Sequence, residues 1–217
     1  MTKKQTALLA VNALREVYPD ALCSLDSSDP YQLLVSVRLS AQCTDARVNL
    51  VTPELFRRYP DAEALSRADV EDVARIIRSC GFFRQKASDI VGAAKMITET
   101  YGGRVPDTIE ELLKLPVVGR KSANLIVGDV YGKPAVVCDT HAIRITNRLG
   151  LTSTKDPAKC ETELRRVLPP EESNNFCHRL VLHGRAVCAA RRPKCGECVM
   201  RDFCETARTT IQTGKEH

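Results

Sequence analysis

Apolar side chains recur at helical spacing along most of the chain. In residues 7–17 they return every three or four positions, and the pattern stops at Tyr18-Pro19. A capping residue before a proline, which suits the first turn of a helix, occurs at Asp29-Pro30, Thr52-Pro53 and Asp156-Pro157. No stretch alternates strictly between apolar and polar residues, and no Asn-Gly turn joins two β-branched segments. The chain is therefore predicted to be all-α, with roughly ten short helices.

Capping residues and glycines predict several helix ends. Ser66 with Asp69 resembles a capping box, and Gly81 closes the helix that follows. Gly102-Gly103 ends a second helix, which is predicted over 84–101. Both predictions rest on local residue preferences alone.

Residues 108–131 predict two helices joined by a tight turn. An amphipathic helix ends near Leu115, residues 116–119 make the turn, and a second helix starts near Arg120. The start of the second helix presents backbone N–H groups and the positive end of a helix dipole, which together form a phosphate site. The same pattern also fits an ordinary corner between two helices.

Composition narrows the class of protein. The 217 residues suffice for one large domain or two small ones, and 27% charged with 43% apolar residues is typical of a globular protein. Apolar stretches reach only about five residues, which excludes membrane insertion because a span needs roughly 18. A net charge of +5 is compatible with a polyanionic partner. The first residues lack the features of a secretory signal, so a cytoplasmic, reducing location is expected.

Four of the ten cysteines fall close together near the C-terminus. Their spacing is C-x6-C-x2-C-x5-C, and the residues are Cys188, Cys195, Cys198 and Cys204. The surrounding stretch has little apolar content, so a buried core does not explain the clustering. Four thiolates on a short loop suit either a tetrahedral zinc ion or a cubane iron–sulfur cluster, and spacing alone does not choose between the two metals. The other six cysteines lie among apolar neighbours and are predicted to be mostly small buried hydrophobes.

Several motifs occur together and in order. Lys-Leu-Pro-Val-Val-Gly-Arg-Lys-Ser-Ala-Asn at 114–124 is followed by Val-Cys-Asp-Thr-His at 137–141 and then by the four-cysteine loop. Leu-Ser-Ala-Gln-Cys-Thr-Asp at 39–45, Ile-Ile-Arg-Ser-Cys-Gly-Phe-Phe at 76–83 and Leu-His-Gly-Arg at 182–185 complete the set. With these segments the chain resembles the endonuclease III family of helix–hairpin–helix DNA glycosylases over almost its whole length.

The resemblance implies a fold, a cofactor and an activity. The expected fold has two lobes: a six-helix barrel over about 23–133 that includes the hairpin, and a cluster domain that joins residues 1–22 to residues 134–217. The four-cysteine loop is expected to hold a [4Fe–4S] cluster. The implied enzyme is a monomeric, nucleoid-associated glycosylase and abasic-site lyase. It would remove oxidised pyrimidines such as thymine glycol from duplex DNA and then cut the strand by β-elimination.

Two residues match the catalytic positions of that family. Lys121 matches the nucleophilic lysine, which attacks the sugar C1′ and becomes a Schiff base. Its expected place in the first helical turn beside Arg120 disfavours the ammonium form. Asp139 matches the catalytic aspartate, whose carboxylate would stabilise positive charge developing on the sugar. Asp139 also suits the N-cap of a helix over 140–149, and the two roles are compatible.

Other matches point to DNA contacts. Gln42 and Phe82 match residues that wedge into the duplex when the damaged base leaves the stack, although Phe82 could be core or exchange roles with Phe83. Gly119 and Arg120 open the second helix of the hairpin. His141 and Asp45 match pocket residues by position. A basic patch for phosphates is expected on the cluster loop, at Arg191, Arg192 and Lys194.

One residue departs from the family pattern. The hairpin of the family usually reads Leu-Pro-Gly-Val-Gly, whereas this chain has Val117 at the first glycine. If that position needs positive φ, a β-branched residue is strained there by about 1–3 kcal/mol. We expect a reshaped hairpin with weaker DNA affinity than a glycine version would have.

Two rival functions stay open on the sequence alone. One is a monofunctional adenine-mismatch glycosylase of the same superfamily, although such enzymes lack the lysine present at Lys121. The other is a catalytically silent iron–sulfur DNA-binding protein, which the departure at Val117 keeps open. The tail from Thr209 to His217 has the composition of a frayed end.

Overall fold

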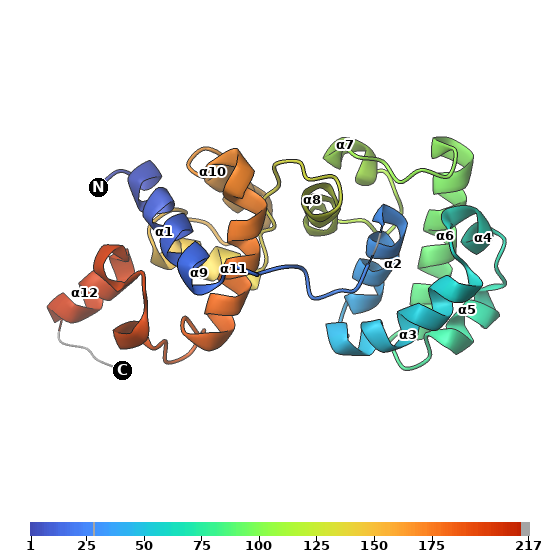
Figure 1. Ribbon diagram of the computed structural model, residues 1–217, viewed down its shortest axis with the longest axis horizontal. Helices are drawn as coiled ribbons and strands as arrows, with labels where there is room; N and C mark the ends of the chain where they lie inside the picture. The colour runs from blue at the N-terminus through green and yellow to red at the C-terminus, as the bar shows by residue number, and fades with distance from the viewer. Residues whose placement is uncertain (28, 214–217) are drawn as a thin grey trace. The chain divides into compact units, whose positions relative to one another are not determined.

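The computed structural model describes the chain except for residue 28 and residues 214–217, and helices joined by loops make up the described part (Figure 1). No β-strand occurs among these residues, so the all-α prediction is confirmed. Contacts within the chain separate two compact units, Cys23–Gly132 and Met1–Leu22 with Lys133–His217. No helix of the described part is long and apolar enough to cross a membrane.

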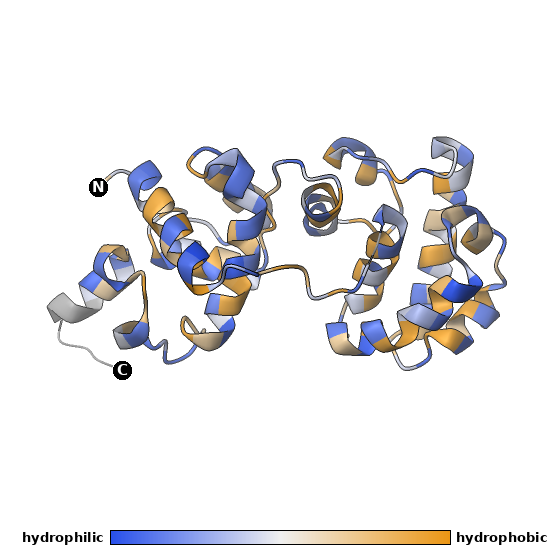
Figure 2. Cartoon of the chain, in the orientation of Figure 1, coloured by the Kyte–Doolittle hydropathy of each residue, from blue (hydrophilic) through white to orange (hydrophobic). Residues whose placement is uncertain are grey.

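Seven helices make up the unit Cys23–Gly132. They are α2 (Pro30–Ser40), α3 (Asp45–Arg58), α4 (Ala62–Ser66), α5 (Val70–Ile76), α6 (Phe83–Tyr101), α7 (Ile109–Leu112) and α8 (Arg120–Asp129). The longest helix, α6, packs against α2, α4 and α5, and α8 packs against α2 and α7. The buried residues of α6 include Ala87, Ile90, Val91, Ala94 and Ile97, which follow the 3.6-residue period of a helix. Figure 2 shows both hydrophobic and hydrophilic residues along the helices of this unit.

The second unit contains the chain's first helix and its C-terminal third. Its helices are α1 (Lys3–Val17), α9 (Thr140–Arg148), α10 (Pro157–Arg165), α11 (Ser173–Ala186) and α12 (Glu205–Thr213), with short 3-10 turns at Pro170–Glu172, Cys195–Glu197 and Arg201–Phe203. α11 packs against α1 and α9, and α12 packs against α9. Phe176 on α11 and Leu14 on α1 are fully buried. A capping box between Thr2 and Gln5 starts α1.

Three local predictions are wrong: the helix start at Thr52-Pro53, the capping box of Ser66 with Asp69, and the helix end at Gly81, because α5 already ends at Ile76. Pro53 lies inside α3, which begins at Asp45 after the Thr44 cap, so the Thr52-Pro53 start is not used. Asp69 is itself the N-cap of α5, and its carboxylate accepts hydrogen bonds from Glu71 and Asp72 instead of joining a capping box with Ser66. The tail is helical as far as Thr213, and its last four residues lie outside the described part of the chain.

Candidate functional site

The hairpin between α7 and α8 is built around a tight turn. The N–H of Val118 donates to the carbonyl oxygen of Leu115 over 3.3 Å, which closes a four-residue β-turn. Pro116 occupies the second position of this turn, and Val117 occupies the third with φ of 67°. Proline at the second position with positive φ at the third is the pattern of a type II turn, which normally takes glycine or asparagine at the third position.

Val117 therefore adopts the conformation that the turn requires instead of reshaping it. The structure thus meets the condition under which strain is predicted, positive φ at a β-branched residue. A β-branched residue in the left-handed region is an outlier and costs about 1–3 kcal/mol. The side chain is 41% exposed, so burial offsets only part of this cost.

The first turn of α8 follows directly. Gly119 is the N-cap with extended backbone and supplies no capping side chain. Arg120 and Lys121 come next, and both side chains are exposed. An uncapped helix start with two cations is a phosphate-binding arrangement, and it presents the Lys121 amine to solvent in the same turn.

Asp139 caps α9 as the sequence predicts. Its Oδ1 accepts a hydrogen bond from the N–H of Ala142 over 2.7 Å, and the helix it starts is Thr140–Arg148. The residues before it, 135–138, are buried, and Asp139 is the first side chain of this segment to reach partial exposure. The cap fixes the direction of the carboxylate.

His141 packs against α11. Its Nδ1 accepts from the Arg144 guanidinium over 3.1 Å, because arginine offers only donors. A Cβ placed on Gly184 would lie 2.3 Å from the same Nδ1, so a larger residue there would displace the His141 or Arg144 side chain. Arg144 also donates to the carbonyl oxygen of Cys188 over 2.9 Å. Arg144 thus joins α9 to the start of the cysteine loop, with His141 held beside it.

Gln42 and Phe82 share an unusual backbone conformation. Gln42 has φ of 53° and Phe82 has φ of 57°, and both side chains are exposed, Phe82 by 70%. Phe82 is therefore not a core residue, whereas Phe83 is half-buried beneath the Arg84 guanidinium. Within the described residues, four non-glycine positions have positive φ: Gln42, Phe82, Val117 and Arg192. All four are residues for which the sequence predicts DNA contact.

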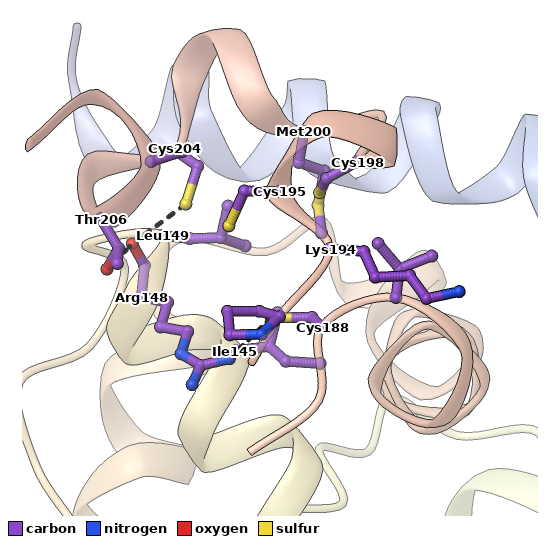
Figure 3. Close-up of a pocket in the computed structure, with 13 residues that line it drawn as sticks. Ile145, Arg148, Leu149, Cys188, Lys194, Cys195, Cys198, Met200, Cys204 and Thr206 are labelled. Carbon is purple, nitrogen blue, oxygen red and sulfur yellow. Dashed lines mark hydrogen bonds between the residues drawn. The ribbon is translucent and has the colours of Figure 1, made fainter. Parts of the chain in front are cut away.

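The four clustered cysteines line one cavity, together with α9 residues such as Ile145 and Arg148 (Figure 3). Burial raises the pKa of Cys198 to about 11 and also raises that of Cys204. Among the described residues, no group of three or more His, Cys, Asp or Glu side chains is arranged to hold a single metal ion. Four thiols around one shared space suit a cubane, in which each thiolate binds a different iron atom.

Hydrogen bonds surround these sulfur atoms. Arg148 donates to the sulfur of Cys188 over 3.2 Å, and Nε2 of His183 lies 3.4 Å from the sulfur of Cys198. Burial lowers the pKa of His183. Such contacts orient the ligands of a metal centre and tune it. Sequence reasoning missed His183 and the pair Arg144 and Arg148, although two arginines one turn apart on a helix were a visible signal.

The loop between the cysteines carries the predicted basic residues at its surface. Arg191, Arg192 and Lys194 are all exposed, and Lys194 lies 3.7 Å from Glu197. Arg192 has φ of 51°, so this loop also contains a strained backbone position. The arrangement presents cations on a loop anchored by the cysteines at both ends.

Comparisons with known proteins agree with this geometry. Residues 35–170 match the family model of the HhH-GPD superfamily base excision DNA repair protein. Residues 188–204, which begin and end on a cysteine, match the iron–sulfur binding domain of endonuclease III. The chain is 49% identical to Endonuclease III of Synechocystis sp. over 96% of each chain, and 41% identical to Endonuclease III of Bacillus subtilis over 94% of each.

Solved structures agree as well. A trapped endonuclease III–DNA covalent intermediate superposes with a TM-score of 0.87 at 37% identity, covering 97% of this chain and 100% of that one. The helical fold, the hairpin and the cysteine loop together define a base excision repair glycosylase and abasic-site lyase with a [4Fe–4S] cluster. The chain belongs to the endonuclease III family.

Proposed function

We propose that this chain excises oxidised pyrimidines such as thymine glycol from duplex DNA and then cleaves the strand through a Schiff base at Lys121. The observation that carries the proposal is the hairpin, where a type II turn leads into a helix start that presents Lys121 next to a phosphate-binding position. The similar endonuclease III was solved as a trapped covalent intermediate with DNA, and such an intermediate needs a nucleophile in that protein.

Lys121 performs the covalent chemistry in this proposal. Its neutral amine attacks C1′ of the damaged nucleotide, the bond from C1′ to the base breaks, and the base leaves with the bonding electron pair. The attached nitrogen then loses one proton to water, the C1′–O4′ bond breaks and O4′ takes up a proton, which leaves a protonated imine between Nζ and C1′. Removal of a C2′ proton then expels the 3′ phosphate, which is the β-elimination that cuts the strand.

Asp139 supplies charge and a proton acceptor. A carboxylate fixed by its bond to Ala142 costs no reorganisation when positive charge develops on the sugar. Its other oxygen is a candidate acceptor for the proton that leaves C2′. We assign the stabilisation of charge and this proton transfer to Asp139.

Gln42 and Phe82 fill the space that the extruded base leaves. Apolar and amide side chains inserted between base steps hold an opened duplex, and both residues stand exposed on loops of the same unit. At the hairpin, the backbone at Val117 and Gly119 and the side chain of Arg120 contact the backbone phosphates, and the exposed cations Arg191, Arg192 and Lys194 do so at the cysteine loop.

The four cysteines that line one cavity are the proposed ligands of the cluster: Cys188, Cys195, Cys198 and Cys204. When bound, the cluster closes the loop and supplies a rigid scaffold for its cations. His141 is a proposed DNA-facing residue by its match to the family, but its bond to Arg144 gives it a positioning role on α9 as well. We propose that the enzyme acts as a monomer in the cytoplasm, at the nucleoid.

Borohydride trapping tests the proposal. The substrates are a duplex with one thymine glycol and the same duplex with an abasic site, and the proteins are the native chain, Lys121→Gln and Lys114→Gln. Lys114 is an exposed lysine just before the same hairpin, so it controls for loss of a positive charge. We expect covalent complexes from the native chain and Lys114→Gln on both duplexes, and none from Lys121→Gln.

The outcomes separate the parts of the proposal. Trapping on the abasic duplex alone refutes the choice of lesion and keeps the lyase chemistry. Binding of damaged duplex by the native chain without trapping on either substrate refutes the covalent mechanism and favours a DNA-binding protein.

A further inference from the structure

Two loops of the unit Cys23–Gly132 carry the proposed wedge residues, and we call residues 41–43 and 80–82 the wedge loops. Both Gln42 and Phe82 are in the left-handed backbone region, which non-glycine residues keep only where the surroundings enforce it. The loops abut, since a Cβ placed on Gly81 would lie 3.6 Å from the carbonyl oxygen of Gln42. Residues packed under the two loops must therefore hold Gln42 and Phe82 in this backbone conformation.

Lys86 lies beneath both loops. It sits in the first turn of α6, and its side chain is only 1% exposed. Its backbone N–H donates to the carbonyl oxygen of Phe82 over 3.0 Å, and its Nζ donates to the carbonyl oxygen of Leu39 over 2.7 Å. Leu39 is in the last turn of α2, two residues before the first wedge loop. One residue therefore ties the end of α2 to the start of α6.

Burial of the Lys86 ammonium group has an unfavourable free energy, because the charge loses its hydration. Desolvation lowers the pKa of Lys86, while the thiols of Cys43 and Cys80, one on each wedge loop, act against that shift. The terminal carbonyl groups of α2 form the negative end of its helix dipole and favour the cation. An apolar residue would fill the same space, but it would leave the buried Leu39 carbonyl unpaired.

We propose that Lys86 is a positioning residue that holds Gln42 and Phe82 in their strained conformations for insertion into the duplex. This inference rests on the proposed function, from which the roles of Gln42 and Phe82 come. Insertion of Gln42 and Phe82 affects the reaction rate only on duplex DNA, because only a duplex has a base stack and an opposite strand. Loss of the Lys86 bond should therefore slow reaction on duplex DNA and spare reaction on the same strand alone.

The test is the rate of imine trapping on an abasic oligonucleotide, measured single-stranded and as a duplex. The proteins are the native chain, Lys86→Met and Lys95→Met; Lys95 is an exposed lysine on the same helix and serves as the matched control. Lys86→Met should lower the duplex rate by roughly tenfold, which corresponds to one lost buried hydrogen bond. Its single-strand rate and both rates of Lys95→Met should stay native. Lys86→Arg, which restores a cationic donor, should recover part of the duplex rate.

Two results would overturn the inference: equal losses on both substrates, which a merely structural role produces, or no loss on the duplex. If Lys86→Met does not fold, as judged by circular dichroism, Lys86→Gln replaces it and is judged by the same two results. If the native chain traps neither substrate, the proposed function itself fails, and the Lys86 inference falls with it.

Discussion

Replacement of Val117 by glycine should make the chain more stable. Val117 has φ of 67° at the third position of a type II turn, a conformation that costs a β-branched residue about 1–3 kcal/mol. Glycine removes that strain but increases the conformational entropy of the unfolded chain, which lowers the free energy of unfolding by about 0.4–1 kcal/mol. Loss of the buried part of the valine side chain lowers the free energy of unfolding further, by on the order of 1 kcal/mol. With strain at the upper end of its range, the net gain is about 1 kcal/mol.

Unfolding and binding together test this prediction. A gain of about 1 kcal/mol corresponds to a rise of roughly 2–4 °C in Tm for a chain of this length. The affinity for a duplex with an uncleavable abasic analogue, measured by fluorescence anisotropy at fixed salt, should also rise, because a bare backbone approaches a phosphate more closely. Val118→Gly is the matched control, since Val118 is half-buried and lacks positive φ; it should lower Tm.

Two results would refute the reasoning about Val117. The first is a fall in Tm for Val117→Gly as large as that for Val118→Gly, because the strain would then be absent. The second is an unchanged or lower affinity for damaged duplex, because the valine would then contribute to DNA binding instead of weakening it.

Three further predictions concern other parts of the molecule. Asp139→Asn keeps a capping oxygen and should change Tm little, but it should slow imine trapping on an abasic duplex at least about 100-fold; equal rates would exclude catalysis by its charge. Cys198→Ser should abolish the visible absorption of the cluster, whereas Cys23→Ser should retain it; the reverse would exclude the proposed ligands. Burial raises the pKa of Tyr31, so ionisation of its phenol destabilises the folded state. The free energy of unfolding, measured with urea, should therefore fall as pH rises above 10.0, and Tyr31→Phe should lessen that fall.

Local signals in the sequence predict much of the fold. Residues 7–17 lie in α1 and reach its C-terminal end, Asp29 and Asp156 cap their helices, and Gly102 ends α6 with φ of 58°. These features depend on residues within one turn of each other. The start predicted at Pro53 fails because Thr44 begins the helix earlier and packing carries it through the proline.

The residues that support the site are harder to predict. The bond from Lys86 to Leu39 joins residues 47 apart in the chain, and the bond from Arg148 to Cys188 joins residues 40 apart. Spacing in the sequence marks some of these residues, such as Arg148, but does not show which distant residue each of them contacts. In the sequence, a lysine that will be buried resembles any other helical lysine, and only the fold shows that Lys86 is buried.

Backbone strain connects the residues predicted to contact DNA with the residues that support them. The non-glycine residues with positive φ in the described chain lie on the wedge loops, in the hairpin turn and on the cysteine loop. Such conformations persist only when neighbouring contacts determine the backbone, and they concentrate at functional sites. At the wedge loops those contacts include the two bonds of Lys86, and at the hairpin they include the bond between Val118 and Leu115. We therefore expect substitutions beneath the wedge loops, such as Lys86→Met, to alter the conformation of these loops and with it the reaction on duplex DNA.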